Sequence, residues 1–203
     1  MLAHWNDRYS NPEYAYGTAP NEWFKEQLTQ LPGKGRILLP AEGEGRNAVF
    51  AAKQGWEVSA FDPSEAGREK ALNLAERESV SIDYQCGYLE EMSYRPESFD
   101  AIGLIFAHLP NGQQGFHQRL IKLLRPGGFV ILEAFSRSNL PYREKNPSIG
   151  GPPKLEMLFS VEMIADHFRG LEVLYLQEEK VELHEGRYHQ GEGMVIRFLG
   201  QKP

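Results

Sequence analysis

Short apolar runs alternate with longer amphipathic stretches along most of this chain. Runs typical of buried strands fall at residues 36–39, 57–61, 81–86, 99–106 and 129–134. Helical spacing predicts helices in the stretches that separate them, the last of which carries Phe116, Leu120 and Leu124 before a Pro-Gly-Gly turn. Strands that alternate with helices predict a parallel sheet covered on both faces.

The alternation of predicted strands and helices ends after residue 135. A stretch rich in Pro and Gly, 136–154, predicts a loop, and 160–168 predicts a helix capped by Ser160. Two strands follow over 171–183 and 194–200, joined by a polar turn that contains glycine. The predicted fold class is therefore α/β: a Rossmann-like, doubly wound seven-stranded sheet, mostly parallel, with a C-terminal antiparallel β-hairpin.

Length and composition fit one ordinary globular domain. The chain has 203 residues, 41% of them hydrophobic and 25% charged, which suits a single domain over 1–203. Within it, 1–30 is predicted to be an aromatic N-terminal lid segment and 136–156 a substrate-side loop. A net charge of −6 disfavours nucleic acid and anionic lipid, so we expect a small-molecule substrate, no nucleic-acid or membrane partner, and a monomer or homodimer.

Cysteine and histidine usage narrows the chemistry further. The single cysteine, Cys86, excludes an internal disulfide and a cysteine-built metal site, and we expect it to be a buried apolar side chain rather than a nucleophile. His184, Glu185, His189 and Glu192 fall in the predicted hairpin turn, at spacings that suit solvent exposure, so no metal site is predicted. The sequence has no apolar run long enough to span a membrane, and its first residues lack the charged-then-apolar pattern of a secretory signal peptide, so we expect a cytoplasmic location.

A glycine-rich turn follows the first predicted strand. Gly43 and Gly45 allow close approach of a ligand, and the helix that begins there should offer unpaired N–H groups to an anionic or strongly polar group. Asp62 ends the second strand about 17 residues after Gly45, near the spacing at which an acid binds a ribose diol. An N-terminal helix cap is the alternative role for Asp62. Together these features predict a site for a nucleoside-bearing cofactor.

Five strand–helix steps, the glycine turn, the acid after strand two and a terminal hairpin resemble the class I S-adenosylmethionine-dependent methyltransferases. The resemblance spans almost the whole chain. The segments Trp5-Asn6-Asp7-Arg8-Tyr9, Gly43-Glu44-Gly45-Arg46-Asn47 and Arg125-Pro126-Gly127-Gly128, with Tyr16-Gly17 and Pro20-Asn21, look like the tellurite-resistance and thiopurine methyltransferase branch.

The resemblance implies S-adenosylmethionine as cofactor, S-adenosylhomocysteine as product and a transferase activity (EC 2.1.1.-). Asp62 would bind the ribose, the two glycines would lie under the methionine part, and the N-terminal aromatics would close over it. The cofactor-binding residues implied are Trp5, Tyr16, Glu42, Gly43, Gly45, Asn47, Asp62, Pro63, Ser64, Gly87, Tyr88, Leu89, Ile105 and Phe106.

The chain departs from the family pattern at the first strand. Leu39 stands where the family carries an acid, and Ala41 replaces the first glycine of the turn. Glu42 is the carboxylate that could take over contacts to the ammonium group of the cofactor. Tyr88 stands where an acid often follows strand three, so adenine recognition should depend on backbone N–H groups and stacking.

Candidate groups for catalysis and acceptor binding are few. His108 lies just past a central strand, on the ligand-binding edge, and is the one catalytic candidate; the alternative is a ring that caps a backbone carbonyl. Tyr14, Arg137 and Arg143 are candidates for substrate contact, the arginines by attracting an anion; a solvated basic loop is the alternative. No cluster of proton acceptors is evident.

Three functions remain open from the sequence. The leading one is methyl transfer to a small molecule, with a soft sulfur, selenium or tellurium nucleophile as one acceptor class, since such a group reacts without a dedicated base. An NAD(P)-linked oxidoreductase shares the glycine turn and the acid, but no hydride-site constellation accompanies them. A non-catalytic S-adenosylmethionine-binding regulator is the third, kept open by Leu39 and Ala41.

Overall fold

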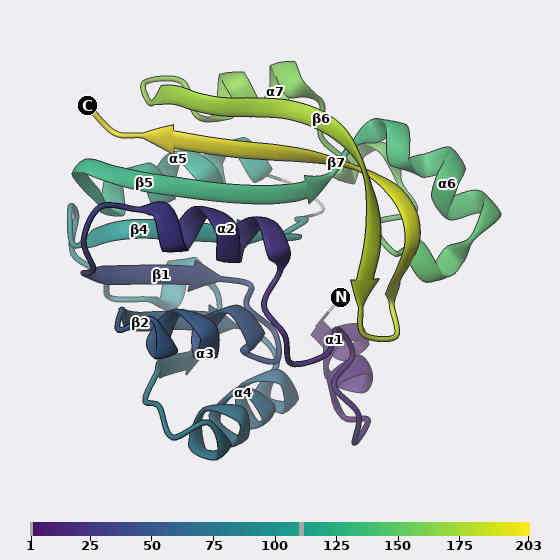
Figure 1. Cartoon of the computed structure of the whole chain (residues 1–203), viewed down its shortest axis with the longest axis horizontal. Coiled ribbons are helices and arrows are strands. Elements are labelled where there is room, and N and C mark those ends of the chain that lie inside the picture. The colour runs from purple at the N-terminus through teal and green to yellow at the C-terminus, as the bar shows by residue number, and fades with distance from the viewer. Residues whose placement is uncertain (1, 110–111) are drawn as a thin grey trace.

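The computed structural model describes residues 2–109 and 112–203, and it folds around one seven-stranded sheet (Figure 1). The strands are β1 (Arg36–Pro40), β2 (Glu57–Asp62), β3 (Asp83–Cys86), β4 (Phe99–Ile105), β5 (Leu124–Phe135), β6 (Glu172–Glu185) and β7 (His189–Gln201). The helices of more than one turn are α1 (Leu2–Tyr9), α2 (Glu22–Gln30), α3 (Arg46–Lys53), α4 (Glu65–Arg77), α5 (Gln113–Leu123), α6 (Leu140–Lys145) and α7 (Val161–His167).

The strand order is β3-β2-β1-β4-β5-β7-β6. The first five strands in that order pair in parallel, and β7 pairs antiparallel with both β5 and β6. The chain therefore winds outward from β1 in one direction, then returns to β4 and winds in the other. This confirms the predicted fold class, and it puts a topological switch point at the carboxyl ends of β1 and β4, where α/β sheets hold their ligands.

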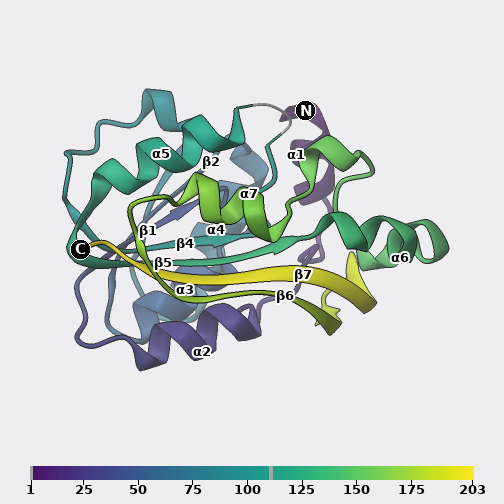
Figure 2. The same ribbon diagram turned by 90° about the horizontal axis from the view of Figure 1, so that it is seen from above.

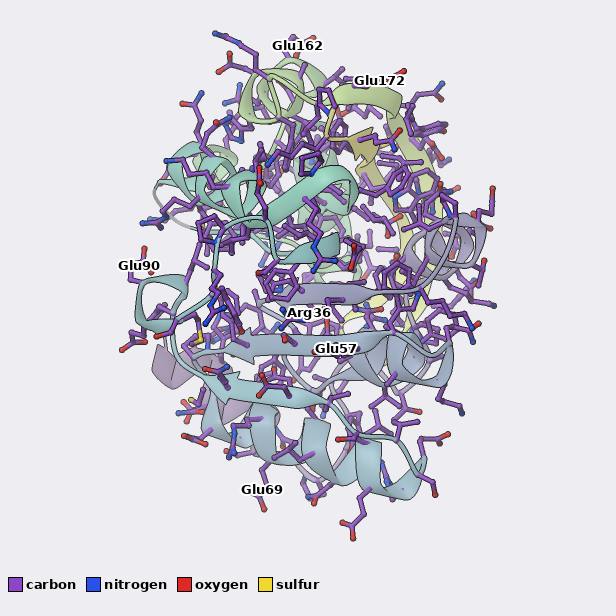
Figure 3. All side chains as sticks on the ribbon, turned by 90° about the vertical axis from the view of Figure 1, so that its left-hand side faces the viewer. Arg36, Glu57, Glu69, Glu90, Glu162 and Glu172 are labelled. Carbon is purple, nitrogen blue, oxygen red and sulfur yellow. The ribbon has the colours of Figure 1, made fainter. Side chains whose placement is uncertain are left out.

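Helices cover both faces of the sheet (Figure 2). The helices α2, α3 and α4 share one buried cluster with β1 and β2, while α5 and α7 share another with β4 and β5. Along β1 the side chains alternate between the two, Ile37 and Leu39 toward the first and Leu38 toward the second. Figure 3 faces the amino edge of the sheet, where Arg36 and Glu57 begin β1 and β2, so the site described below lies at the far edge.

Two segments differ from the prediction. The stretch predicted as a loop from residue 136 contains the 3₁₀ turns Arg137–Asn139, Pro147–Ile149 and Leu155–Met157 as well as α6; Pro at helix N-termini, not only in turns, explains the misreading. The hairpin strands pair all the way from Glu172 to Glu185 and from His189 to Gln201, so the connecting turn is far shorter than the polar composition suggested. Their tip extends beyond the sheet to α1 (Figure 1).

Candidate functional site

The glycine turn between β1 and α3 is held tightly from three sides at Gly43. Its N–H donates to Asp62, at 3.2 Å, and its carbonyl accepts the Tyr84 hydroxyl, at 2.6 Å. Its φ is 61°, and a Cβ built there would lie 2.6 Å from the Tyr9 hydroxyl. Gly45 has a φ of 84°, and its Cβ would lie 2.5 Å from that of Ala71 in α4. Both positions require glycine.

Asp62 lies at the carboxyl end of β2 and joins the glycine turn to the next loop. Its carboxylate accepts the N–H groups of Gly43 and of Ser64, the latter at 2.9 Å. Burial raises the pKa of Asp62 to about 6, against the two backbone N–H groups that lower it. The cap of α4 is Ser64, whose hydroxyl accepts the Gly67 N–H, so Asp62 is not needed for that alternative role.

Glu42 occupies the N-terminus of α3. One of its carboxylate oxygens accepts the N–H groups of Asn47 and Ala48, each at 2.8 Å, and burial raises the pKa of Glu42 to about 7. The expectation that these N–H groups are unpaired is therefore wrong. The N-terminus of α3 is therefore already occupied by the carboxylate of Glu42. This residue follows Ala41, which replaces the first glycine of the family's turn.

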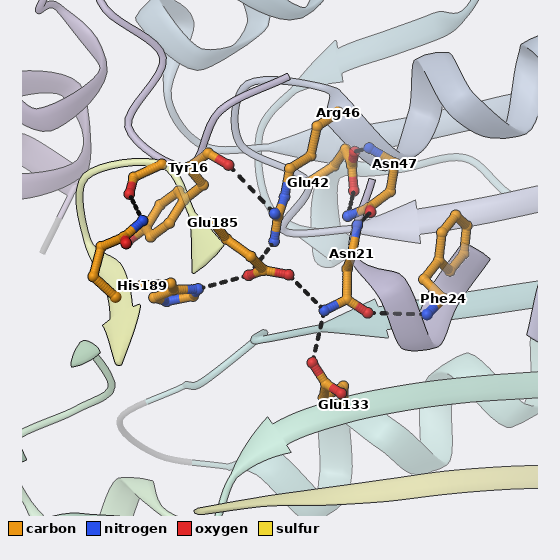
Figure 4. A network of polar contacts seen from close by, with 11 residues as sticks. Tyr16, Asn21, Phe24, Glu42, Arg46, Asn47, Glu133, Glu185 and His189 are labelled. Carbon is orange, nitrogen blue, oxygen red and sulfur yellow. Dashed lines mark hydrogen bonds and ion pairs between the residues drawn. The ribbon is translucent and has the colours of Figure 1, made fainter. Parts of the chain in front are cut away.

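A network of buried polar contacts surrounds Glu185 at the hairpin tip (Figure 4). The carboxylate pairs with Arg46 at 2.9 Å, lies 2.9 Å from Nδ1 of His189 and accepts Asn21 Nδ2 at 2.8 Å. The same Asn21 amide donates to Glu133 at 2.6 Å. The Arg46 pair and the His189 contact hold the pKa of Glu185 down, to about 2, despite burial. The expectation that Glu185 and His189 are solvent-exposed is wrong, since His189 is only 4% exposed.

The hairpin tip and the N-terminal segment pack against each other. The Arg187 N–H donates to the Ala15 carbonyl at 2.9 Å, and Gly186 touches the backbone of Tyr16 so closely that no Cβ would fit. Further along, α1 reaches the loop after β2, where the Ser64 hydroxyl donates to Asn6 at 2.6 Å. A cavity of about 250 Å³ lies between segment and tip, lined by residues that include Arg8, Tyr14, Arg187 and Tyr188.

Both ring nitrogens of His108 are engaged by backbone groups. Nε2 accepts the Phe135 N–H at 3.0 Å, which leaves Nδ1 to donate to the Met157 carbonyl at 2.8 Å. Burial lowers the pKa of His108 to about 4. The ring has no free lone pair, and this geometry favours the alternative interpretation, a histidine that joins loops, over a catalytic role.

The remaining predicted residues divide by position. Pro63 and Gly87 lie together in the loops after β2 and β3, since Gly87 N–H donates to the Asp62 carbonyl; Tyr88 and Leu89 follow, with the Tyr88 side chain half exposed. Ile105 and Phe106 end β4, and Phe106 has a φ of 54°. Trp5 stacks on Tyr9. Cys86 is half-buried, its thiol bonded to the Pro63 carbonyl, and burial raises its pKa to about 11.

The three residues predicted to contact substrate lie outside the network. The Tyr14 hydroxyl donates to the Lys70 carbonyl of α4 and accepts from Arg77. Arg137 is exposed, and Arg143 donates to the Gly151 carbonyl at 2.9 Å. Sequence reasoning named Tyr9, Asn21 and Arg46 only as parts of motifs, and it missed the buried Glu185–His189 pair. A signal for the pair existed: two polar residues equidistant from the centre of a short glycine turn face each other across a hairpin.

The described residues hold neither a candidate metal site nor a helix that could span a membrane. In 2–109 and 112–203 no three His, Cys, Asp or Glu side chains come together as metal ligands would. Over the same ranges, no helix has the length and apolar character needed to cross a membrane.

The sheet order is that of a doubly wound α/β fold, and the glycine turn and Asp62 lie at its ligand-binding edge. Residues 37–128 match a sequence family described as "Methyltransferase domain". The ubiquinone biosynthesis O-methyltransferase of Coxiella burnetii is 31% identical over 127 residues, which are 60% of this chain and 51% of that protein. The protein of the same name from Methylocella silvestris is 32% identical over 105 residues, 51% of this chain and 41% of that protein. The chain thus spans about half the length of the curated relatives it matches.

Solved structures agree on the fold. One, from work on the conversion of a disulfide bond into a thioacetal group during echinomycin biosynthesis, has a TM-score of 0.77 at 16% identity and covers 100% of this chain and 92% of that chain. TehB from Haemophilus influenzae has a TM-score of 0.72 at 16% identity and covers 100% and 67%. A SAM-dependent methyltransferase from Methanosarcina mazei has a TM-score of 0.70 at 13% identity and covers 91% and 98%. The matches support the predicted resemblance to class I S-adenosylmethionine-dependent methyltransferases.

Proposed function

We propose that this protein transfers a methyl group from S-adenosylmethionine to a small-molecule acceptor. The observation that carries the proposal is Asp62, a buried carboxylate at the carboxyl end of β2 that also fixes the glycine turn through the Gly43 N–H. A carboxylate in that place is suited to accept hydrogen bonds from both hydroxyls of a ribose.

The residues around the turn fit this cofactor better than a dinucleotide. A pyrophosphate would need the N–H groups at the start of α3, but Glu42 already accepts those of Asn47 and Ala48. A negative ligand there would face a carboxylate, whereas a cationic ammonium or sulfonium would be attracted to it. The oxidoreductase alternative is disfavoured on this ground.

S-adenosylmethionine supplies an activated methyl group on a sulfonium, so the tasks left to the chain are orientation and exclusion of water. The α1 helix serves the second task, since Tyr9 lies against Gly43 and Asn6 accepts the Ser64 hydroxyl. The flat faces of Trp5 and Tyr16 suit a sulfonium through cation–π attraction.

The acceptor class is the finer part of the proposal. The sequence suggests the tellurite-resistance and thiopurine branch and a soft sulfur, selenium or tellurium nucleophile, and the fold similarity to TehB is compatible with it. The names of the curated relatives point instead to oxygen as the accepting atom. A screen of methyl transfer from radiolabelled S-adenosylmethionine over thiols, selenite, tellurite, amines and phenols separates these classes. No product from any of them would favour the non-catalytic regulator.

Asp62 provides the test of cofactor binding. We expect Asp62→Ala to weaken S-adenosylhomocysteine binding about 10- to 100-fold by calorimetry, because hydrogen bonds to a charged group are lost. Asp83→Ala is the matched control: Asp83 is an exposed aspartate that begins β3, at the other edge of the sheet, and its variant should bind as the wild type does. Thermal stabilisation by NAD but not by S-adenosylhomocysteine would overturn the proposal.

A further inference from the structure

Glu185 and His189 form a carboxylate–imidazole pair of defined polarity. They face each other directly across the hairpin, and Glu185 Oε2 lies 2.9 Å from Nδ1 of His189. Because the carboxylate is ionised, with a pKa of about 2, it can only accept, so Nδ1 must carry the proton. Nε2 then presents a lone pair, and no described residue donates a hydrogen bond to it.

The His189 ring lies among aromatic side chains beside the carboxyl end of β4. Its centroid is 4.5 Å from those of Tyr16 and Phe106 and 5.2 Å from that of Phe135. Phe106 directly follows β4, which pairs with β1 at the switch point of the sheet. Arg46, which pairs with the same Glu185, directly follows Gly45 of the glycine turn. The pair is thus linked to the proposed cofactor site through α3.

The ring is in the state that a proton acceptor needs. Burial lowers the pKa of His189 below its usual value, although Glu185 opposes this, so the imidazole is neutral near pH 7. The contrast with His108 is direct, since both nitrogens of that ring are already bonded. The ionisable groups that face His189 from the surrounding elements are Arg8, Tyr16, Arg46, His108 and Glu185.

We propose that the acceptor in the proposed reaction is an aromatic hydroxyl compound bound against Tyr16 and Phe106, and that Nε2 of His189 takes its proton. This rests on the proposed function. The acceptor oxygen bonds to the methyl carbon, the carbon–sulfur bond breaks with its electron pair left on sulfur, and the hydroxyl proton moves to Nε2. Glu185 is the positioning residue that stabilises the resulting imidazolium.

The backbone at Gly150 lies against the Nε2 side of the His189 ring. A Cβ on Gly150 would lie 2.6 Å from His189 Cδ2 and 3.1 Å from Nε2, so this backbone covers the edge of the ring. Gly150 and Gly151 have φ values of 85° and 86°, which allow this close approach. This part of the 136–156 segment, predicted to lie on the substrate side, must shift for an acceptor to reach Nε2.

The test compares His189→Ala with His184→Ala, an exposed histidine of the same hairpin. The probes are radiolabelled S-adenosylmethionine with catechol and with 4-methylcatechol, and with selenite, which is already ionised. We expect His189→Ala to lower methyl transfer to the catechols about 10²- to 10⁴-fold, while His184→Ala stays within about twofold and S-adenosylhomocysteine binds all three proteins equally. Transfer to selenite but to neither catechol, or an equal loss in both variants, overturns the proposal.

Two further measurements separate a catalytic role from a structural one. In wild type, kcat/KM should fall as the pH drops through the pKa of His189; Glu185→Gln should move that limb to lower pH, because the carboxylate raises the pKa of the ring. The ¹⁵N spectrum of the protein without ligand should show the proton on Nδ1, and an Nε2–H tautomer would contradict the proposal. If the wild-type protein does not bind S-adenosylhomocysteine, the proposed function itself is wrong.

Discussion

The glycine turn and the hairpin tip both bury carboxylates, yet they treat the charge in opposite ways. At the turn, Asp62 and Glu42 accept mainly backbone N–H groups, and burial raises their pKa values to about 6 and about 7. At the tip, Glu185 pairs with Arg46, and its pKa falls to about 2. A charge without a partner is costly in a protein interior, whereas a paired one is held in place. Under the proposed function, a cationic ligand would supply the partner that the carboxylates of the turn lack, whereas Arg46 already supplies it at the tip.

The two regions also differ in how far apart their partners lie in the sequence. Glu42 bonds to Asn47, five positions away, and Gly43 bonds to Asp62, 19 positions away. At the tip, Arg46 and Asn21 reach Glu185 over 139 and 164 positions. The carboxylates of the turn are therefore held by contacts nearer in the sequence. Apart from the Glu185–His189 contact, four positions apart, the tip depends on contacts that only the complete sheet brings together.

Breaking the pair at the tip should have the largest effect on stability. Glu185→Ala leaves Arg46 buried without its ion-pair partner, and removing one member of a buried pair costs about 3–5 kcal/mol. Glu192→Ala, which breaks the exposed pair with Lys180 on the same hairpin, should leave the melting temperature nearly unchanged. Because the pKa of Glu185 is lowered, its contribution is present above pH 4.5 and lost as the pH falls toward 2. Equal melting temperatures would show that the tip is not held by charge.

The number of positions that separates interacting residues also explains which features could be predicted from the sequence. Strand runs such as 57–61 and the spacing from Gly45 to Asp62 are local signals, and the fold class follows from them. The Ser160 cap was likewise predicted and confirmed, since its hydroxyl accepts the Met163 N–H. Glu185 and His189 appeared as a polar turn because burial by the N-terminal segment depends on residues far away in the chain. The contact of Glu42 with a cofactor stays a prediction, whereas its hydrogen bonds to the N–H groups of α3 had no signal in the sequence.

Packing at the glycine turn should show the next largest effect. Gly45→Ala combines a left-handed backbone with a Cβ 2.5 Å from Ala71, a cost of about 2–4 kcal/mol in unfolding free energy. Gly33→Ala provides the control, since its φ of 81° is similar but nothing lies within 4 Å of the added atom. In that variant the unfolding free energy should fall only by the cost of placing alanine in a left-handed backbone conformation, about 1–2 kcal/mol. Denaturant unfolding of both proteins measures the difference, and similar losses would mean that α4 yields to the added methyl.

Unpaired carboxylates predict a pH dependence of cofactor binding. With raised pKa values, Asp62 and Glu42 contribute stability that is present below about pH 4 and lost as the pH rises through 6 to 7. Ligand binding should change in the opposite direction, with S-adenosylmethionine affinity rising about tenfold from pH 5 to pH 8 as Asp62 ionises. S-adenosylhomocysteine lacks the sulfonium charge and should gain less, as calorimetry at both pH values would show. If the affinity for neither ligand changes with pH, Asp62 and Glu42 do not contribute to cofactor binding.

The smallest effect should distinguish two helix caps of the same kind. Ser64 caps α4 and Ser160 caps α7, each accepting the N–H three residues on. Replacing either with Ala should cost about 1 kcal/mol of stability. Only Ser64 also donates to Asn6 of α1, at 2.6 Å, so only Ser64→Ala loosens the helix that packs over Gly43. We expect stopped-flow measurements to show faster S-adenosylhomocysteine release from Ser64→Ala alone. If both variants release it at the wild-type rate, α1 does not hold the cofactor, and the aromatic residues of the N-terminal segment serve the hairpin tip instead.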